Sequence, residues 1–101
     1  MVNYSGLLSE LKLRAFVVDD SEHMRTLLSR LLQRMDIQTK EYEDGSKALI
    51  AVGDEKPDFI LTDYSMEPMD GLSFLRALRH LKNDKVRMTP VIMITGHAER
   101  E

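Results

Sequence analysis

The chain has 101 residues, a formal net charge of −3 at neutral pH, no cysteine, 43% hydrophobic residues and 31% charged residues. This length and composition are typical of one soluble globular domain; the lack of cysteine excludes disulfides and thiolate catalysis, and the acidic balance argues against general nucleic-acid binding. No apolar stretch is long enough to span a bilayer and no signal-peptide pattern opens the chain, so we expect a cytoplasmic domain without membrane partners.

The first third of the chain contains a leader, a strand and a helix. Residues 1–12 form the leader, and the apolar run 13–18 predicts a buried strand. Over residues 24–35 apolar side chains recur every three or four positions, which predicts an amphipathic helix with Ser21 as its N-cap. The same helix carries three basic residues that could form a docking surface beside a functional site and that we expect by default to be solvated: Arg25, Arg30 and Arg34.

The rest of the chain continues this alternation of strand and helix patterns. In order, we expect an edge strand over 37–43, a turn at Asp44 and Gly45, a short helix over 48–53, a strand over 58–62, a loop over 66–71 with Asp70 as a cap, a helix over 72–81, a polar connector over 82–89 and a strand over 91–94. Strands that alternate with helices predict an α/β fold, a doubly wound parallel sheet with helices on both faces and right-handed crossovers.

Polar side chains follow three of the predicted strands at the point where each strand ends. Asp19 and Asp20 follow the first strand, Asp63 follows the third strand after Thr62, and Thr95 ends the fourth. Ligands of open α/β sheets bind outside the carboxyl ends of the strands, so we expect these side chains to meet. Carboxylates held together repel one another, and Mg²⁺ resolves that repulsion because it prefers oxygen ligands. The convergence therefore predicts a site for a divalent cation and a phosphoryl group.

Three segments of the chain closely resemble the receiver domain of two-component response regulators, a family that includes a single-domain chemotaxis regulator. These segments are residues 16–21 (FVVDDS), 62–71 (TDYSMEPMDG) and 91–96 (VIMITG). Three motifs in the right order at strand ends are far more specific than any one of them alone. The resemblance covers residues 13–101, which we take as the receiver domain, and it implies a flavodoxin-like strand order of 2-1-3-4.

The resemblance also implies a role for each residue at the strand ends. Asp63 would accept a phosphoryl group from a sensor histidine kinase or a phosphotransfer protein, and Thr95 would hydrogen-bond that group. A carboxylate can form such a covalent acyl phosphate. Asp20 and Asp63 would bind Mg²⁺ directly, Asp19 largely through water, and Ser65 through its backbone carbonyl. Phosphorylation would then change the affinity for a downstream effector protein, so the resemblance implies a signalling module of a phosphorelay, not an enzyme.

The sequence departs from the family pattern in two places. The loop after Asp63 usually reads Met-Pro-x-Met-Asp-Gly, whereas here Glu67 precedes Pro68, and Ser65 replaces an Asn at the carbonyl-donating position. The chain also stops six residues after Thr95, before the fourth helix, fifth strand and fifth helix of a receiver and before the family's phosphate-pairing Lys. We therefore expect a C-terminally incomplete domain. Its fourth strand would be an open apolar edge, which favours pairing with a second copy as a homodimer.

Two alternatives to a phosphoacceptor remain. One is a non-phosphorylated receiver-like module that serves only for interaction or dimerisation; the missing Lys favours it, and the intact acids weaken it. The other is a metal-dependent phosphatase with an aspartyl nucleophile. That class usually has a second Asp two places after the nucleophile, where Ser65 follows Asp63 here, so the phosphatase is disfavoured.

Overall fold

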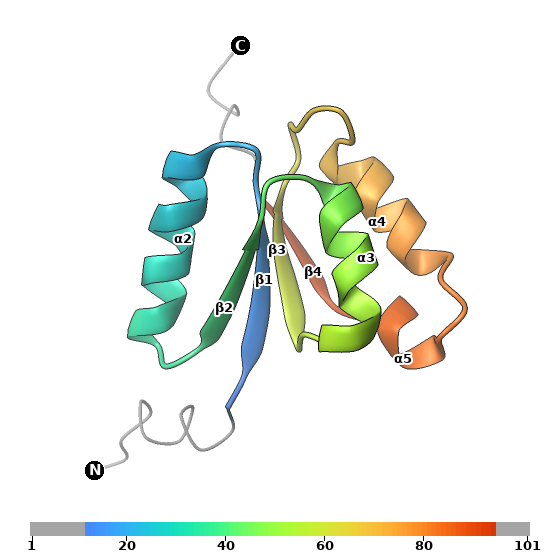
Figure 1. Cartoon of the computed structure of the whole chain (residues 1–101), viewed down its shortest axis with the longest axis horizontal. Helices are drawn as coiled ribbons and strands as arrows, with labels where there is room; N and C mark the ends of the chain where they lie inside the picture. Colours follow the sequence, from blue (N-terminus) through green and yellow to red (C-terminus); the bar gives the residue numbers. More distant parts are fainter. Residues whose placement is uncertain (1–11, 95–101) are drawn as a thin grey trace.

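The computed structural model describes residues 12–94, which form a parallel sheet with helices on both faces (Figure 1). The described elements are β1 (Arg14–Val18), α2 (Glu22–Arg34), β2 (Gln38–Tyr42), α3 (Gly45–Glu55), β3 (Phe59–Asp63), α4 (Gly71–Arg79), α5 (Asp84–Arg87) and β4 (Val91–Ile94). The strands lie side by side in the order β2-β1-β3-β4, which confirms the predicted α/β fold and strand order. Residues 1–11 of the predicted leader, and Thr95, fall outside the described range.

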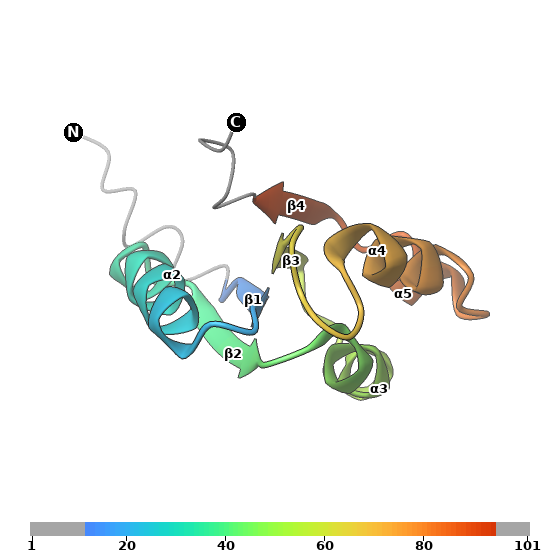
Figure 2. The same cartoon turned by 90° about the horizontal axis from the view of Figure 1, so that it is seen from above.

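Different helices cover the two faces of the sheet. Seen from above, α2 lies on one side of the sheet, while α3, α4 and α5 lie on the other (Figure 2). Phe16 and Val18 of β1 pack in one buried cluster with residues of α3 and α4, whereas Ala15 and Val17 pack in a second cluster with Leu32 of α2. Successive side chains of a strand point to opposite faces, so a strand buried on both faces appears in the sequence as a continuous apolar run.

A polar side chain caps the N-terminus of each described helix by accepting a hydrogen bond from a backbone N–H. The caps are Ser21 for α2, Asp44 for α3, Asp70 for α4 and Asn83 for α5. A cap of this kind typically stabilises a helix by about 1 kcal/mol. The predicted caps Ser21 and Asp70 are confirmed, and the predicted turn at Asp44 is the beginning of α3.

Two predictions about the connecting segments are wrong. The second helix begins at Gly45 and ends at Glu55, so it extends beyond the predicted range 48–53 at both ends. The segment 82–89, predicted as a polar connector, contains the four-residue helix α5. Apolar periodicity cannot reveal so short a helix. Its start depends on the side chain of Asn83, which accepts hydrogen bonds from two backbone N–H groups.

Among residues 12–94, three residues other than glycine have left-handed backbone conformations. They are Lys12 with φ of 54°, Asp36 with φ of 62° and Lys56 with φ of 47°. Each lies shortly before a strand, in the segments that lead into β1, β2 and β3 respectively. A side chain with a Cβ atom makes this conformation unfavourable. The resulting strain therefore lies at the amino ends of the strands.

The strands β2 and β4 form the two edges of the sheet. Within residues 12–94, β4 pairs with β3 alone, and its Ile92 is 51% exposed. Pairing of this edge with a second copy stays a prediction. None of the helices in the described part of the chain combines the length and the apolar character that crossing a membrane requires.

Candidate functional site

The carboxyl ends of β1 and β3 bring three aspartates together. The parallel register pairs Val18 with Thr62, so Asp19, which follows β1, and Asp63, which ends β3, leave the sheet side by side. Asp20 comes next, in the turn that leads into α2 at the upper edge of the sheet in Figure 1. One carboxylate oxygen from each of the three aspartates lies within 4.8 Å of the others. The structure therefore brings together the acids that the sequence predicted to meet.

The three carboxylates differ in their exposure to solvent. Asp19 and Asp63 are 4% and 9% exposed, whereas Asp20 is exposed. Burial raises the pKa of Asp19 above its ordinary value, the backbone N–H of Ser21 opposes this change, and the nearby charges of Asp63 and Asp20 raise the pKa further. The like-charge repulsion expected from the sequence is present, but the loss of water contributes more to the pKa of Asp19.

Each carboxylate of the cluster accepts one hydrogen bond from a backbone N–H. These bonds are Ser21 N–H to Asp19 Oδ1 (2.9 Å), Ser65 N–H to Asp63 Oδ1 (3.3 Å) and Glu67 N–H to Asp20 Oδ2 (3.3 Å). Across residues 12–94, no Lys or Arg side chain forms an ion pair with any of the three acids. Neutral backbone donors orient the carboxylates; the nearby charge of Arg25 lowers the pKa of Asp19, but its guanidinium pairs with Glu41 and not with the cluster.

The donor atoms of this cluster fit a hard divalent cation. Asp19, Asp20 and Asp63 offer carboxylate oxygens, and no His from the described residues joins the group. Mg²⁺ prefers oxygen ligands, and proteins usually bind it through one or two carboxylates together with water. Softer metals are selected by sulfur and imidazole ligands instead. A group of oxygens that lie within 4.8 Å of one another suits one ion whose coordination is completed by water.

Helix α4 begins directly against the end of β3, and this close approach requires glycine at position 71. The N–H of Gly71 donates to the carbonyl oxygen of Tyr64 at 2.8 Å. A Cβ atom at this position would lie 2.5 Å from the carbonyl oxygen of Asp63 and 2.9 Å from the Cα of Tyr64. Because both are backbone atoms, a larger residue would displace Asp63 itself. Gly71 therefore fixes the backbone that carries Asp63.

Arg25 contacts the site, and the expectation that its side chain is solvated is wrong. Its guanidinium donates to the backbone carbonyl of Asp19 at 2.7 Å and lies 3.6 Å from the carboxylate of Glu41. The side chain is only 15% exposed, whereas Arg30 and Arg34 are exposed as expected. The Arg25 side chain thus connects α2 to the ends of β1 and β2. Helical periodicity carries no signal for this contact, because a long side chain makes it across three elements.

The other residues expected at the site have different positions. Ser65 lies in the loop after β3, which borders a surface hollow of about 450 Å³. Thr62 is 1% exposed, and its hydroxyl donates to the backbone carbonyl of Asp63 at 3.2 Å, so it belongs to the core. Thr95 lies outside the described residues. The sequence also gave no indication of Glu67, whose contact with Asp20 is made by a backbone group.

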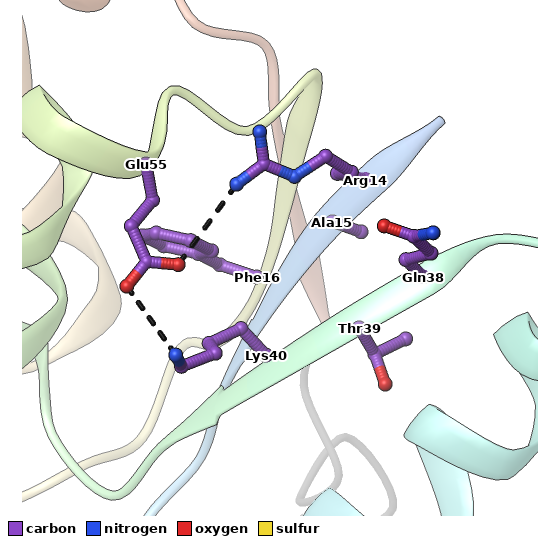
Figure 3. Close-up of a pocket in the computed structure, with 7 residues that line it drawn as sticks. All are labelled: Arg14, Ala15, Phe16, Gln38, Thr39, Lys40 and Glu55. Atoms are coloured by element: carbon purple, nitrogen blue, oxygen red, sulfur yellow. Dashed lines mark ion pairs between the residues drawn. The ribbon is translucent and has the colours of Figure 1, made fainter. Parts of the chain in front are cut away.

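A second hollow, of about 200 Å³, lies beside the amino ends of β1 and β2 (Figure 3). Arg14 and Lys40 approach the carboxylate of Glu55 from opposite sides, at 3.9 and 3.4 Å. The hydroxyl of Tyr42 also donates to this carboxylate at 3.3 Å. The charge of Glu55 is therefore balanced by residues of the chain itself.

Comparison with known proteins agrees with the fold. The family model of the response regulator receiver domain matches residues 15–101. Chemotaxis protein CheY of Pseudomonas aeruginosa is 33% identical over 90 residues, which make up 88% of this chain and 71% of that protein. The DNA-binding transcriptional regulator NtrC of Salmonella typhimurium is 33% identical over 84 residues, which make up 83% of this chain and 17% of NtrC.

Solved structures show the same similarity. The N-terminal domain of a response regulator receiver protein from Methanoculleus marisnigri has a TM-score of 0.72 and 31% identity, over 79% of this chain and 63% of that chain. Chemotaxis protein CheY4 of Vibrio cholerae has a TM-score of 0.73 and 30% identity, over 80% of this chain and 66% of that chain. The chain thus spans slightly less than two thirds of these two solved chains. It belongs to the response regulator receiver domain family.

Proposed function

We propose that this receiver accepts a phosphoryl group on Asp63 in a Mg²⁺-dependent reaction of a two-component phosphorelay. One observation carries the proposal: the carboxylate of Asp63 lies at the end of β3, within 4.8 Å of those of Asp19 and Asp20. A carboxylate nucleophile can take up a phosphoryl group only if nearby positive charge offsets the charge of the phosphoryl oxygens. The cluster, whose carboxylates form no ion pair within the described residues, is suited to hold that positive charge as a cation.

The neighbouring residues have separate roles in this proposal. Asp20 and Asp63 would hold Mg²⁺ directly, Asp19 would hold it largely through water, and Ser65 would contribute its backbone carbonyl. The cation would supply Lewis-acid charge that lets an anionic phosphoryl group approach an anionic carboxylate. Thr95, which follows β4 in the sequence, would donate a hydrogen bond to the transferred group.

The transfer step exchanges one bond to phosphorus for another. An oxygen of the Asp63 carboxylate forms a bond to the phosphorus while the phosphorus–nitrogen bond of a phosphohistidine breaks. The departing imidazole keeps the electron pair of that bond and takes a proton from solvent. The donor would be a sensor histidine kinase or a phosphotransfer protein, and the acyl phosphate on Asp63 would change the affinity for a downstream effector protein.

We assign this activity to a cytoplasmic receiver comprising residues 13–101, preceded by a leader over residues 1–12. The family match begins at residue 15, close to this boundary. The cysteine-free composition agrees with the proposed location. In this proposal the module catalyses only its own phosphoryl transfer and dephosphorylation, and direct contact with nucleic acid or membrane has no part in it.

Intact mass spectrometry after incubation with acetyl phosphate and Mg²⁺ tests the proposal. We expect one adduct of about 80 Da, the mass of a phosphoryl group that replaces a proton on an acyl oxygen. Asp63→Asn should abolish the adduct, and removal of Mg²⁺ with EDTA should suppress it. Asp54→Asn is the matched control, because Asp54 is an exposed acid on α3 away from the cluster. An adduct that persists in Asp63→Asn would refute the assignment, and no adduct on the native chain would favour the interaction module.

A further inference from the structure

The loop between β3 and α4, residues 64–70, is fixed at both ends. The N–H of Tyr64 donates to the carbonyl of Ile94 at 2.7 Å, and the N–H of Gly71 donates to the carbonyl of Tyr64 at 2.8 Å. Among the described residues, one hydrogen bond joins this loop to the segment between β1 and α2. It runs from the N–H of Glu67 to Oδ2 of Asp20, at 3.3 Å, and connects residues that are 47 positions apart.

The position of the Asp20 side chain depends on its hydrogen bond more than the positions of Asp19 and Asp63 depend on their own hydrogen bonds. Asp19 and Asp63 are buried, so packing limits the positions that their side chains can adopt, but Asp20 is exposed. An exposed side chain samples several rotamers, and ordering it when a ligand binds costs conformational entropy. A hydrogen bond from an N–H to a carboxylate is charge-assisted, so it favours the rotamers that keep Asp20 near Glu67, although at 3.3 Å it is longer than the strongest bonds of this kind. It occupies one carboxylate oxygen and leaves the other for an ion.

The donor is a backbone group, so the role of position 67 depends on whether its residue has an N–H. Proline has none, and proline follows immediately at position 68. The order Glu67-Pro68 places a donor opposite Asp20, whereas the reverse order would remove it. The side chain of Glu67 is exposed and forms no ion pair within the described residues, so its carboxylate is not needed for this contact.

We propose that Glu67 is a positioning residue whose N–H holds Asp20 ready for the cation, so that metal occupancy and the conformation of the loop depend on each other. The inference rests on the proposed function, because it takes Asp20 as a metal ligand. Partners that orient metal ligands commonly change metal affinity by about 10–100-fold. Linkage is reciprocal, so a loop that favours the metal is itself stabilised by the metal. The hollow of about 450 Å³ that this loop lines would then change with metal occupancy.

A titration of the full chain with Mg²⁺ alone, monitored through the amide NMR signals, tests this role. Glu67→Ala keeps the N–H and removes the carboxylate, so its Kd for Mg²⁺ should stay within about two-fold of the native value. Glu67→Pro removes the N–H and should raise the Kd by about 10-fold, the lower end of effects reported for partners of metal ligands. An unchanged Kd in Glu67→Pro, or the same loss in Glu67→Ala, would overturn the inference.

A double-mutant cycle separates positioning from general damage to the loop. In an Asp20→Ala background the acceptor is gone, so Glu67→Pro should cause no further change in the Kd. A further loss of similar size would show that the proline acts by another route. If Glu67→Pro does not fold, the native chain supplies the measurement instead: the amide proton of Glu67 should exchange with solvent more slowly in saturating Mg²⁺. Exchange that Mg²⁺ leaves unchanged would overturn the inference.

The outcomes also distinguish this inference from the proposed function. An acetyl phosphate adduct on Asp63 together with a native Kd in Glu67→Pro would overturn the role of Glu67 and leave the phosphoacceptor intact. A native chain that binds no Mg²⁺ and forms no adduct would overturn both.

Discussion

The carboxylates at the two ends of this sheet have different kinds of partner. At the carboxyl ends of the strands, Asp19, Asp20 and Asp63 lie together, and within residues 12–94 they accept hydrogen bonds only from neutral backbone groups. Beside the amino ends, Glu55 has a cation on each side, Arg14 among them, and a phenol as a third partner. One end holds three carboxylates that form no ion pair among the described residues, and the carboxylate at the other end is neutralised by two ion pairs within the chain.

This difference shows why a hollow alone does not identify a ligand site. A hollow of about 450 Å³ borders the loop after β3, and a hollow of about 200 Å³ lies beside Glu55. What distinguishes them is whether the charged groups already have partners. Like charges without counterions destabilise the folded state, and a bound cation can remove that cost. The acid cluster is therefore the end at which binding would gain most.

The largest expected effect comes from a change to the backbone behind the acid cluster. Gly71→Ala would place a Cβ atom 2.5 Å from the carbonyl oxygen of Asp63. We expect a loss of about 2–3 kcal/mol in the free energy of unfolding, the upper range for overpacking, and loss of the acetyl phosphate adduct. Urea denaturation and intact mass measure the two effects.

Gly53→Ala is the matched control for that substitution. A Cβ atom at Gly53 would have no neighbour within 4 Å, and no described glycine has a positive φ. The same change in the exposed part of α3 should therefore stabilise the protein by about 0.5–1 kcal/mol, the difference in helix propensity. Equal effects of the two substitutions would contradict the close approach of α4 to β3.

The second expected effect is a gain in stability when the cluster loses a charge. Asp19→Asn keeps an oxygen that can accept from the N–H of Ser21, and it removes a buried carboxylate that lies beside two others. In EDTA at neutral pH we expect a gain of about 1 kcal/mol, typical of removing an unfavourable group from a functional site. Saturating Mg²⁺ should reduce this advantage, since it would favour the native cluster.

The pH dependence of that gain has a definite sign. Burial, with the nearby Asp63 and Asp20 charges, raises the pKa of Asp19 above its ordinary value of 3.8, so the folded state holds the proton more tightly than the unfolded state. The unfavourable contribution is absent below this ordinary value and complete once the pH exceeds the raised pKa. The difference in Tm between Asp19→Asn and the native chain should therefore shrink as the pH falls toward 3.8.

Ser29→Ala is a control for Asp19→Asn, because it should also stabilise the protein but for a different reason. The hydroxyl of Ser29 is buried and has no hydrogen-bond partner among the described residues. Its removal should stabilise the protein by up to about 1 kcal/mol, because an unsatisfied buried hydroxyl is unfavourable. This gain should not vary with pH or Mg²⁺. If the gain in Ser29→Ala did vary with pH or Mg²⁺, the acid cluster would not be the source of that dependence in Asp19→Asn.

The smallest expected effect is at the neutralised end of the sheet. Glu55→Gln removes two ion pairs between side chains that are each at least 30% exposed, so we expect a loss of only about 0.5 kcal/mol. Burial and the neighbouring Glu55 raise the pKa of Tyr42, so ultraviolet titration of the phenol should show that pKa moving down in the variant. If Glu55→Gln lost more free energy of unfolding than Gly71→Ala, the neutralised end would be the more important one for stability, which contradicts this comparison.

The sequence predicted the sheet and the acid cluster because both depend on features that a chain shows locally. Apolar runs of strand length identified the strands, and parallel strands must place Asp19 and Asp63 at the same edge. Ser21 and Asp70 could be predicted as caps because Ser and Asp are among the residues preferred at the N-cap of a helix. These inferences needed only residue order, whereas the strand order 2-1-3-4 came from the resemblance to the receiver family.

The remaining features depend on contacts between distant parts of the chain. The side chain of Arg25 reaches the carbonyl of Asp19 and the carboxylate of Glu41, and no pattern along α2 distinguishes it from the exposed Arg30. The contact of Glu67 with Asp20 uses a backbone N–H, which nearly every residue has. Helix α5 is too short to show a period. Such features follow from the packed structure rather than from local composition.

The left-handed residues before three of the strands have a consequence for how the protein can be adjusted. Lys12, Asp36 and Lys56 all lie at the sheet end opposite the acid cluster. Glycine would relieve the local strain at each of them, at a smaller cost in unfolded-state entropy. The stability of the folded protein can therefore be adjusted from a region that touches none of the reacting groups.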